Sequence, residues 1–180
     1  FSDFLNRDVY MISVTRLKSH DNVFATLSLK NMAMGAPVNH WRQREYEGRN
    51  EKPLMHGGGN RHLSYNMFLM AFRGVRPNLA VLDGVVGMEG SGPVSGDPID
   101  HGVVLASPDW LAADRMGVEL MGVDYRRVMY LRWCGQAGLG QDDRSKIHVI
   151  GPDPAPHVKH YRMHKNIAEQ LEWIEKDGLL

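Results

Sequence analysis

Residues 79–96 read LAVLDGVVGMEGSGPVSG, an apolar run followed by a glycine-rich stretch that holds the carboxylates Asp83 and Glu89. The run over 79–82 predicts a short buried strand, and open α/β sheets bind ligands at the carboxyl ends of such strands. Glycines let a backbone adopt positive φ and approach a bound group closely. The stretch therefore predicts a ligand crevice whose loop contacts come from Gly87, Gly90 and Gly92, although tight-turn glycines that bind nothing explain it equally well.

The rest of the chain alternates between strand and helix patterns. Short apolar or β-branched runs predict further strands over 9–14, 102–106 and 146–150. Apolar periodicity and end signals predict helices over 26–35, 62–73, 107–121, 125–134 and 159–176, with a long loop over 37–60. This alternation predicts a single α/β domain over 1–180, with a mostly parallel sheet and helices on both faces in a Rossmann-like, three-layer arrangement.

Composition narrows the class of protein. Lys plus Arg and Asp plus Glu both total 21, so a net charge of zero argues against nucleic acid as a partner. No run reaches the roughly 18 apolar residues of a membrane span. The single cysteine, Cys134, excludes an iron–sulfur cluster ligated by this chain alone and reads as a buried thiol. We expect a soluble protein, cytoplasmic or exported. Because the chain starts at Phe1, we also expect an amino-terminal segment or signal to be missing.

A second group of candidate residues is cationic. Lys18, His20 and Lys30 could form a pocket for a carboxylate or phosphate, because lysine supplies a compact charge and histidine a donor that titrates near neutral pH. Asn31 could present its amide to the same anion, or simply end a helix. The alternative is that both lysines are solvated and that His20 is a turn residue.

The carboxylates also have two interpretations. Asp83 and Glu89 could hold a divalent cation together with waters, or act as base and acid. Alternatively, Asp83 braces the loop and Glu89 faces water. Asp109 and Asp114 flank a predicted helix start, where capping is the stronger explanation for Asp109. Asp114 is a secondary candidate for the same crevice.

The histidines give a weaker metal signal. His160 and His164 are spaced to share one helical face and could chelate zinc or nickel. Lysines on both sides make a solvated basic face the stronger explanation. We interpret three other histidines, His40, His56 and His62, as ordinary polar residues.

Three stretches together resemble the family catalogued as domain of unknown function 362 (DUF362). They are Leu17–His20 with Ser28–Asn31, then Asp83–Gly96, then Leu105–Asp109 leading to 112–114 and 121–122. The Gly-Met-Glu-Gly-x-Gly-Pro core is the most specific of them. The resemblance spans about 9–151, leaves 152–180 as a carboxyl-terminal helix, and implies that this chain is the carboxyl-terminal part of the domain.

The resemblance also implies partners, but it implies no reaction. Members of the family occur alone or beside a ferredoxin-like segment with iron–sulfur clusters, and some are exported. The leading hypothesis is a domain that binds a small anionic molecule, with a divalent metal as a candidate cofactor, in a crevice formed by Lys18, His20, Lys30, Asp83 and Glu89. Such a domain could be an enzyme that acts by proton transfer or redox chemistry. The alternative is a non-catalytic module that docks to an iron–sulfur protein.

Overall fold

The strands form one mixed sheet in the computed structural model, which describes residues 5–6, 8–37 and 52–180. The order is β2 (Phe24–Thr26), β1 (Ile12–His20), β3 (Leu79–Glu89), β4 (Asp97–Ser107). The central pair β1 and β3 is parallel, and both outer pairs are antiparallel. The predicted α/β class is confirmed. The sheet is mixed because short connections join β1 to β2 and β3 to β4, and such connections force antiparallel pairing.

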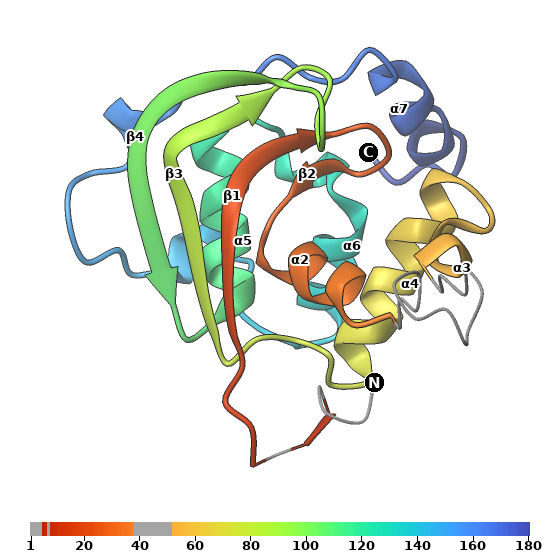
Figure 1. The fold of residues 1–180 in the computed structure, drawn as a ribbon, viewed down its shortest axis with the longest axis horizontal. Coiled ribbons are helices and arrows are strands. Elements are labelled where there is room, and N and C mark those ends of the chain that lie inside the picture. The colour runs from red at the N-terminus through yellow and green to blue at the C-terminus, as the bar shows by residue number, and fades with distance from the viewer. Residues whose placement is uncertain (1–4, 7, 38–51) are drawn as a thin grey trace, which may run out of the picture.

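Helices gather on the inner side of the curved sheet (Figure 1). Their bounds are α2 (Ser28–Gly35), α3 (Lys52–His56), α4 (Asn60–Phe72), α5 (Trp110–Leu120), α6 (Met129–Gln136) and α7 (Ile167–Lys176). Single 3-10 turns lie at Tyr125–Arg127, Arg144–Lys146 and Ala155–His157. α5 packs on β3 and β4, while α2 packs on β1. Leu17, Leu82 and Leu111 are fully buried in the resulting core.

The two faces of the sheet differ. Side chains alternate across a strand, and in β1 the residues that face the helices are buried whereas Ile12 and Val14 are 54% and 64% exposed. Val14 is level with Val81, which in turn is level with Ala106 on β4. Val104, on the same side, is 59% exposed. In the described part of the chain, helices are therefore seen to cover one face, and the three-layer arrangement is not confirmed.

β3 is longer than the predicted strand over 79–82, so Asp83 lies within the strand and Glu89 at its last position. The strand can extend this far because two of its positions are glycine, where a side chain would clash with packed neighbours. A Cβ at Gly84 would lie 2.7 Å from Leu17 Cδ1, and one at Gly87 would lie 2.1 Å from Tyr161 Oη. Part of the expected glycine loop is therefore strand, and the loop itself is residues 90–96.

β1 also exceeds its prediction, since it begins at Ile12 and runs to His20 rather than ending at Val14. Ser13 and Ser19 are tolerated inside because their hydroxyls have partners. Ser13 Oγ donates to Ser28 O at 3.0 Å, and Ser19 Oγ donates to Gly90 O at 3.0 Å. Lys18 and His20 consequently lie in this strand, so the alternative that made His20 a turn residue is wrong.

Three other predictions need correction. The helix predicted over 159–176 exists only as α7, because the backbone N–H groups of Lys159 and Tyr161 donate to Leu120 O and Met121 O at the end of α5. The strand predicted over 146–150 is absent from the described structure. The loop predicted over 37–60 contains α3 and the start of α4, and residues 38–51 lie outside the described part.

Candidate functional site

The end of β1 and the first turn of α2 bring Lys18, His20 and Lys30 together. Lys18 is half-buried, whereas His20 and Lys30 are only 3% and 6% exposed. Burial is the main cause that lowers the pKa of Lys30 and of His20, and charge adds to it: Lys18 lowers the pKa of Lys30, and Lys30 lowers the pKa of His20. Three residues that the sequence grouped by type thus form one cluster, which we call the cationic cluster.

α2 is held in place by Asp114 from α5. This fully buried carboxylate accepts hydrogen bonds from Ser28 N at 2.8 Å and Leu29 N at 3.0 Å, so it satisfies two free N–H groups at the start of the helix. Burial raises the pKa of Asp114 to about 6. Asp114, a predicted ligand-binding residue, therefore lies beneath the cluster and supports it.

Lys30 is the most unusual member of the cluster. It forms no hydrogen bond or ion pair with any residue that the structure describes. Burial, followed by the nearby charges of Lys18 and Lys52, lowers its pKa to about 8, and Asp21 opposes that shift. Burying an ammonium group without a paired anion costs free energy. Asp21 opposes the shift without forming an ion pair with Lys30, so Lys30 has no paired anion among the described residues.

His20 is locked beside a carboxylate. Its Nδ1 lies 2.9 Å from Asp21 Oδ1 and accepts from Asn22 N at 3.0 Å, and Gln170 of α7 donates from Nε2 to His20 O at 2.9 Å. The same Gln170 accepts from Phe24 N at 2.6 Å, where Phe24 has φ of +65°. Burial is the main cause that lowers the pKa of His20 to about 4. The ring is therefore neutral at neutral pH and rigidly placed.

Sequence reasoning missed three members of this neighbourhood. Asp21 is directly after His20. His56 of α3 is close enough for Lys30 to lower its pKa, after burial as the larger cause. Thr26 is level with Lys18 on β2, and its buried Oγ1 has no hydrogen-bond partner among the described residues. The sequence signal for Asp21 was its place beside His20, but the positions of His56 and Thr26 depend on tertiary structure.

The glycine loop borders the cluster. Lys18 Nζ donates to Pro93 O at 3.3 Å. Gly90 has φ of +70°, and a Cβ at Gly92 would lie 2.2 Å from Ser19 O. These glycines allow the loop to pack directly on the end of β1, which accounts for them without a ligand. Gly87 likewise faces Tyr161.

The two predicted catalytic carboxylates are engaged elsewhere. Asp83 is level with Arg16 and Val104 on the open face, and its Oδ1 accepts from Val85 N at 3.0 Å. Glu89 Oε2 accepts from Arg162 N at 2.9 Å, and its Oε1 lies 3.6 Å from the Arg162 guanidinium. Neither carboxylate contributes to the pKa shifts of Lys18, His20 or Lys30.

Asn31 and Asp109 have structural partners. Asn31 Nδ2 donates to Ser13 Oγ at 3.1 Å and so joins α2 to β1. Asp109 caps α5 by accepting from Leu111 N and Ala112 N, both at 3.0 Å, and its other oxygen accepts from Gln141 N at 2.9 Å. The capping interpretation of Asp109 therefore matches its contacts.

Metal ligands are not assembled in the described part of the chain, where no group of three or more His, Cys, Asp or Glu side chains could hold an ion. His160 and His164 lie before α7, so they do not share a helical face as predicted. His62 lies on α4, and His40 is outside the described residues. Cys134 is buried, and burial raises the pKa of its thiol.

None of the described helices has the length and apolar character needed to cross a bilayer. No solved structure matches the chain significantly. A thylakoid-associated protein of Synechocystis sp. is 28% identical over 116 residues, which are 63% of this chain and 33% of the relative. The chain thus spans about a third of that relative's length.

The match to the family reaches less far along the chain than the resemblance over 9–151 suggested. The sequence model for the domain of unknown function DUF362 matches residues 2–119. This range contains both strands of the parallel pair, the glycine loop, and nearly all of the helix that supplies Asp114. The chain belongs to the DUF362 family.

Proposed function

We propose that this domain binds a small carboxylate or phosphate at the cationic cluster. The observation that carries the proposal is Lys30, a buried ammonium without an acidic partner in the described structure, placed close to Lys18. A bound anion would pair with this ammonium, and the hydroxyl of Thr26, which has no partner in the part of the chain that the structure describes, could donate to it. Perturbed, uncompensated charges of this kind are enriched at functional sites.

In an enzyme that used this site, the lysines and His20 would have different chemical roles. Lys18 and Lys30 would hold the anion and stabilise negative charge that develops on it. His20 is neutral and hydrogen-bonded to Asp21, so it could accept a proton as a base. We assign proton transfer to His20 rather than to Asp83 or Glu89, because those carboxylates bind backbone N–H groups away from the lysines.

The test is calorimetric titration with inorganic phosphate and, separately, malonate at pH 7 and low salt. We expect saturable binding of at least one anion, and a loss of about tenfold or more in Lys30→Met and Lys18→Met, since each removes a charged hydrogen-bond donor. Lys176→Met is the matched control, because Lys176 is an exposed lysine that pairs with Glu172. Equal affinity in all four proteins, or no binding, would contradict the proposal.

Docking to an iron–sulfur protein is the second candidate function, and the open face of the sheet favours it. Val14, Val81 and Ala106 form an apolar row there, next to a row with Arg16 and Asp83. Arg16 forms no ion pair with a described residue, so it could meet an acidic group of a partner. Apolar patches with a polar border are typical of protein interaction sites.

Titration of the 15N-labelled chain with a purified acidic two-cluster ferredoxin tests this candidate by NMR. We expect resonance shifts confined to β1, β3 and β4, which should vanish in Val14→Lys and Val104→Lys. Shifts that persist in both variants, or no shifts in the wild-type chain, would exclude docking through this face.

A further inference from the structure

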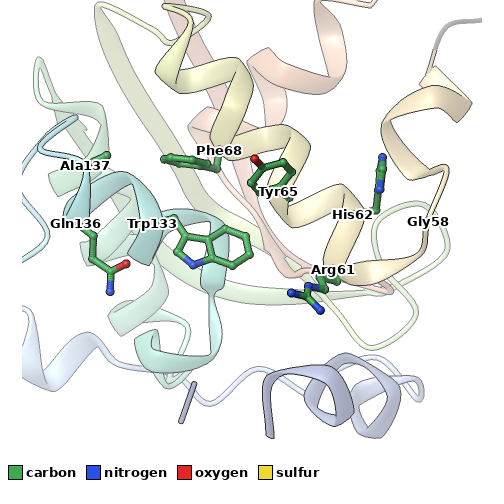
Figure 2. A pocket seen from close by; sticks show the side chains of 8 residues that line it. All are labelled: Gly58, Arg61, His62, Tyr65, Phe68, Trp133, Gln136 and Ala137. Atoms are coloured by element: carbon green, nitrogen blue, oxygen red, sulfur yellow. The ribbon is translucent and has the colours of Figure 1, made fainter. Parts of the chain in front are cut away.

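A hollow lies between α4 and α6, and its described lining contains no residue of the cationic cluster. Its volume is about 720 Å³, and its lining includes Arg61, His62, Tyr65 and Phe68 from α4 with Trp133 and Gln136 from α6. Figure 2 shows these side chains and the ribbon of the two helices. Binding sites for small molecules have volumes of roughly 300–1,000 Å³, so the size fits a ligand of two or three fused rings.

Three aromatic rings form the walls. The ring centroids of Tyr65, Phe68 and Trp133 are each 6.2 Å from the other two, with interplanar angles of 43°, 63° and 84°. Trp173 of α7 supports the Trp133 ring at 6.0 Å. Tyr65 is 49% exposed, so its ring is open to a ligand. Aromatic side chains in such arrangements favour edge and offset contacts with another flat ring.

The polar residues of this hollow are hydrogen-bond donors or cations, and no carboxylate is among its described lining residues. Arg61 pairs with Asp177 at 3.1 Å, but its side chain is 65% exposed and has further N–H groups to donate. Figure 2 shows Arg61 and Gln136 on either side of the Trp133 indole. An aromatic site can also bind a cation, but the guanidinium of Arg61 would repel one.

We propose that this hollow binds a planar aromatic molecule that bears an anionic group. Its ring would lie against Tyr65, Phe68 and Trp133, and its anionic group would accept hydrogen bonds from Arg61 and Gln136. The described lining of this hollow shares no residue with the cationic cluster. A protein could therefore hold an aromatic ligand here whether or not a small anion is bound near Lys30.

The probe is 2-naphthalenesulfonate, and its binding is measured by saturation-transfer NMR and calorimetry. Cyclohexanesulfonate is the comparison, because it carries the same charge without an aromatic ring. We expect saturable binding of the naphthalene compound, about tenfold tighter than that of the cyclohexane compound, as ring contacts of about 1.4 kcal/mol would give. Equal affinities or no saturable binding of the naphthalene compound would overturn the proposal.

Variants of the lining residues test where on the protein the probe binds. Trp133→Leu and Tyr65→Leu are each expected to weaken binding about tenfold and Arg61→Gln several-fold, with circular dichroism to confirm folding. Phe72→Leu is the matched control, because Phe72 is an exposed aromatic residue of the same helix that does not line the hollow. An equal loss in Phe72→Leu, or no loss in Tyr65→Leu, would show that the probe binds elsewhere.

Discussion

The cationic cluster and the carboxylates predicted to work with it are held by the fold in opposite ways. Lys30 is buried without an acidic partner in the described structure, whereas Glu89 is bound by both the backbone and the side chain of Arg162. Asp83 and Asp114 likewise accept backbone N–H groups. The carboxylates stabilise the structure, and the lysines retain charge that a ligand could use. Residue type alone therefore does not tell which charged side chains the fold pairs and which it leaves without an ion pair among the described residues.

The largest effect is expected where a carboxylate supports the cluster. Asp114→Ala removes the acceptor for Ser28 N and Leu29 N and leaves both unsatisfied in the core. We expect a loss of about 2–4 kcal/mol in the free energy of unfolding, measured by urea denaturation. Asp114→Asn, which keeps one acceptor oxygen, should lose less. A change below about 0.5 kcal/mol in the alanine variant would show that α2 does not depend on this cap.

A smaller effect is expected in the loop beside Lys18. In Gly92→Ala the new Cβ would lie 2.2 Å from Ser19 O, a backbone atom that cannot move aside alone. Overpacking of this kind costs about 1–3 kcal/mol in the free energy of unfolding. Gly102→Ala has no atom within 4 Å of its Cβ but has a φ of +78°, so it separates backbone strain from a clash. A Gly92→Ala protein as stable as wild type would remove the packing explanation for the loop glycines.

Lys30→Met should stabilise the protein, in contrast to both changes above. The pKa of Lys30 is about 8 in the folded state, below its ordinary value of 10.5, so the charged form is disfavoured by folding. Below pH 8 that penalty is fully present, and we expect the Met variant to be more stable by about 1–2 kcal/mol. As the pH rises from 8 to 10.5, this penalty disappears, and the free energies of unfolding of the two proteins should converge.

Thermal or urea unfolding of both proteins at pH 7 and pH 10 measures this convergence. Lys176→Met is again the control, because Lys176 is exposed and its pKa is raised by Glu172. A Lys30→Met protein that is less stable than wild type at pH 7 would mean that the ammonium has a stabilising partner.

The smallest effect is expected at Glu89. Glu89→Gln keeps an oxygen that can accept from Arg162 N, and it loses only a half-exposed ion pair. Such pairs contribute about 0–1 kcal/mol, so stability should change little. Phosphate affinity measured by calorimetry should be unchanged. A tenfold change in that affinity would show that Glu89 belongs to the anion site, and would contradict the distinction between the lysines and the carboxylates.

Local patterns predicted the elements whose ends carry strong signals. Asp109 caps α5 as its position suggested, and α4 and α2 lie close to their predicted ranges. β1 was predicted too short because Thr15, Lys18 and Ser19 are polar. The hydroxyls of Ser13 and Ser19 have partners on α2 and the glycine loop that compensate for their burial, and neither partner is local in sequence.

The candidate site was predictable in part. Lys18, His20 and Lys30 were named from residue type and spacing, and the fold brings them together. The environment that distinguishes them was not predictable, since it depends on Asp114, Gln170 and His56 from distant elements. The helix predicted over 159–176 was wrong over its first part, because the backbone N–H groups of Lys159 and Tyr161 donate to carbonyls at the end of α5.

The most direct measurement is the pKa of Lys30, obtained by NMR titration of the 13Cε and 15Nζ resonances with and without inorganic phosphate. We expect a pKa of about 8 in the free protein and a higher value with phosphate, because a bound anion stabilises the ammonium. A pKa near 10.5 that phosphate does not change would show that Lys30 is a solvated lysine, and would contradict the anion site.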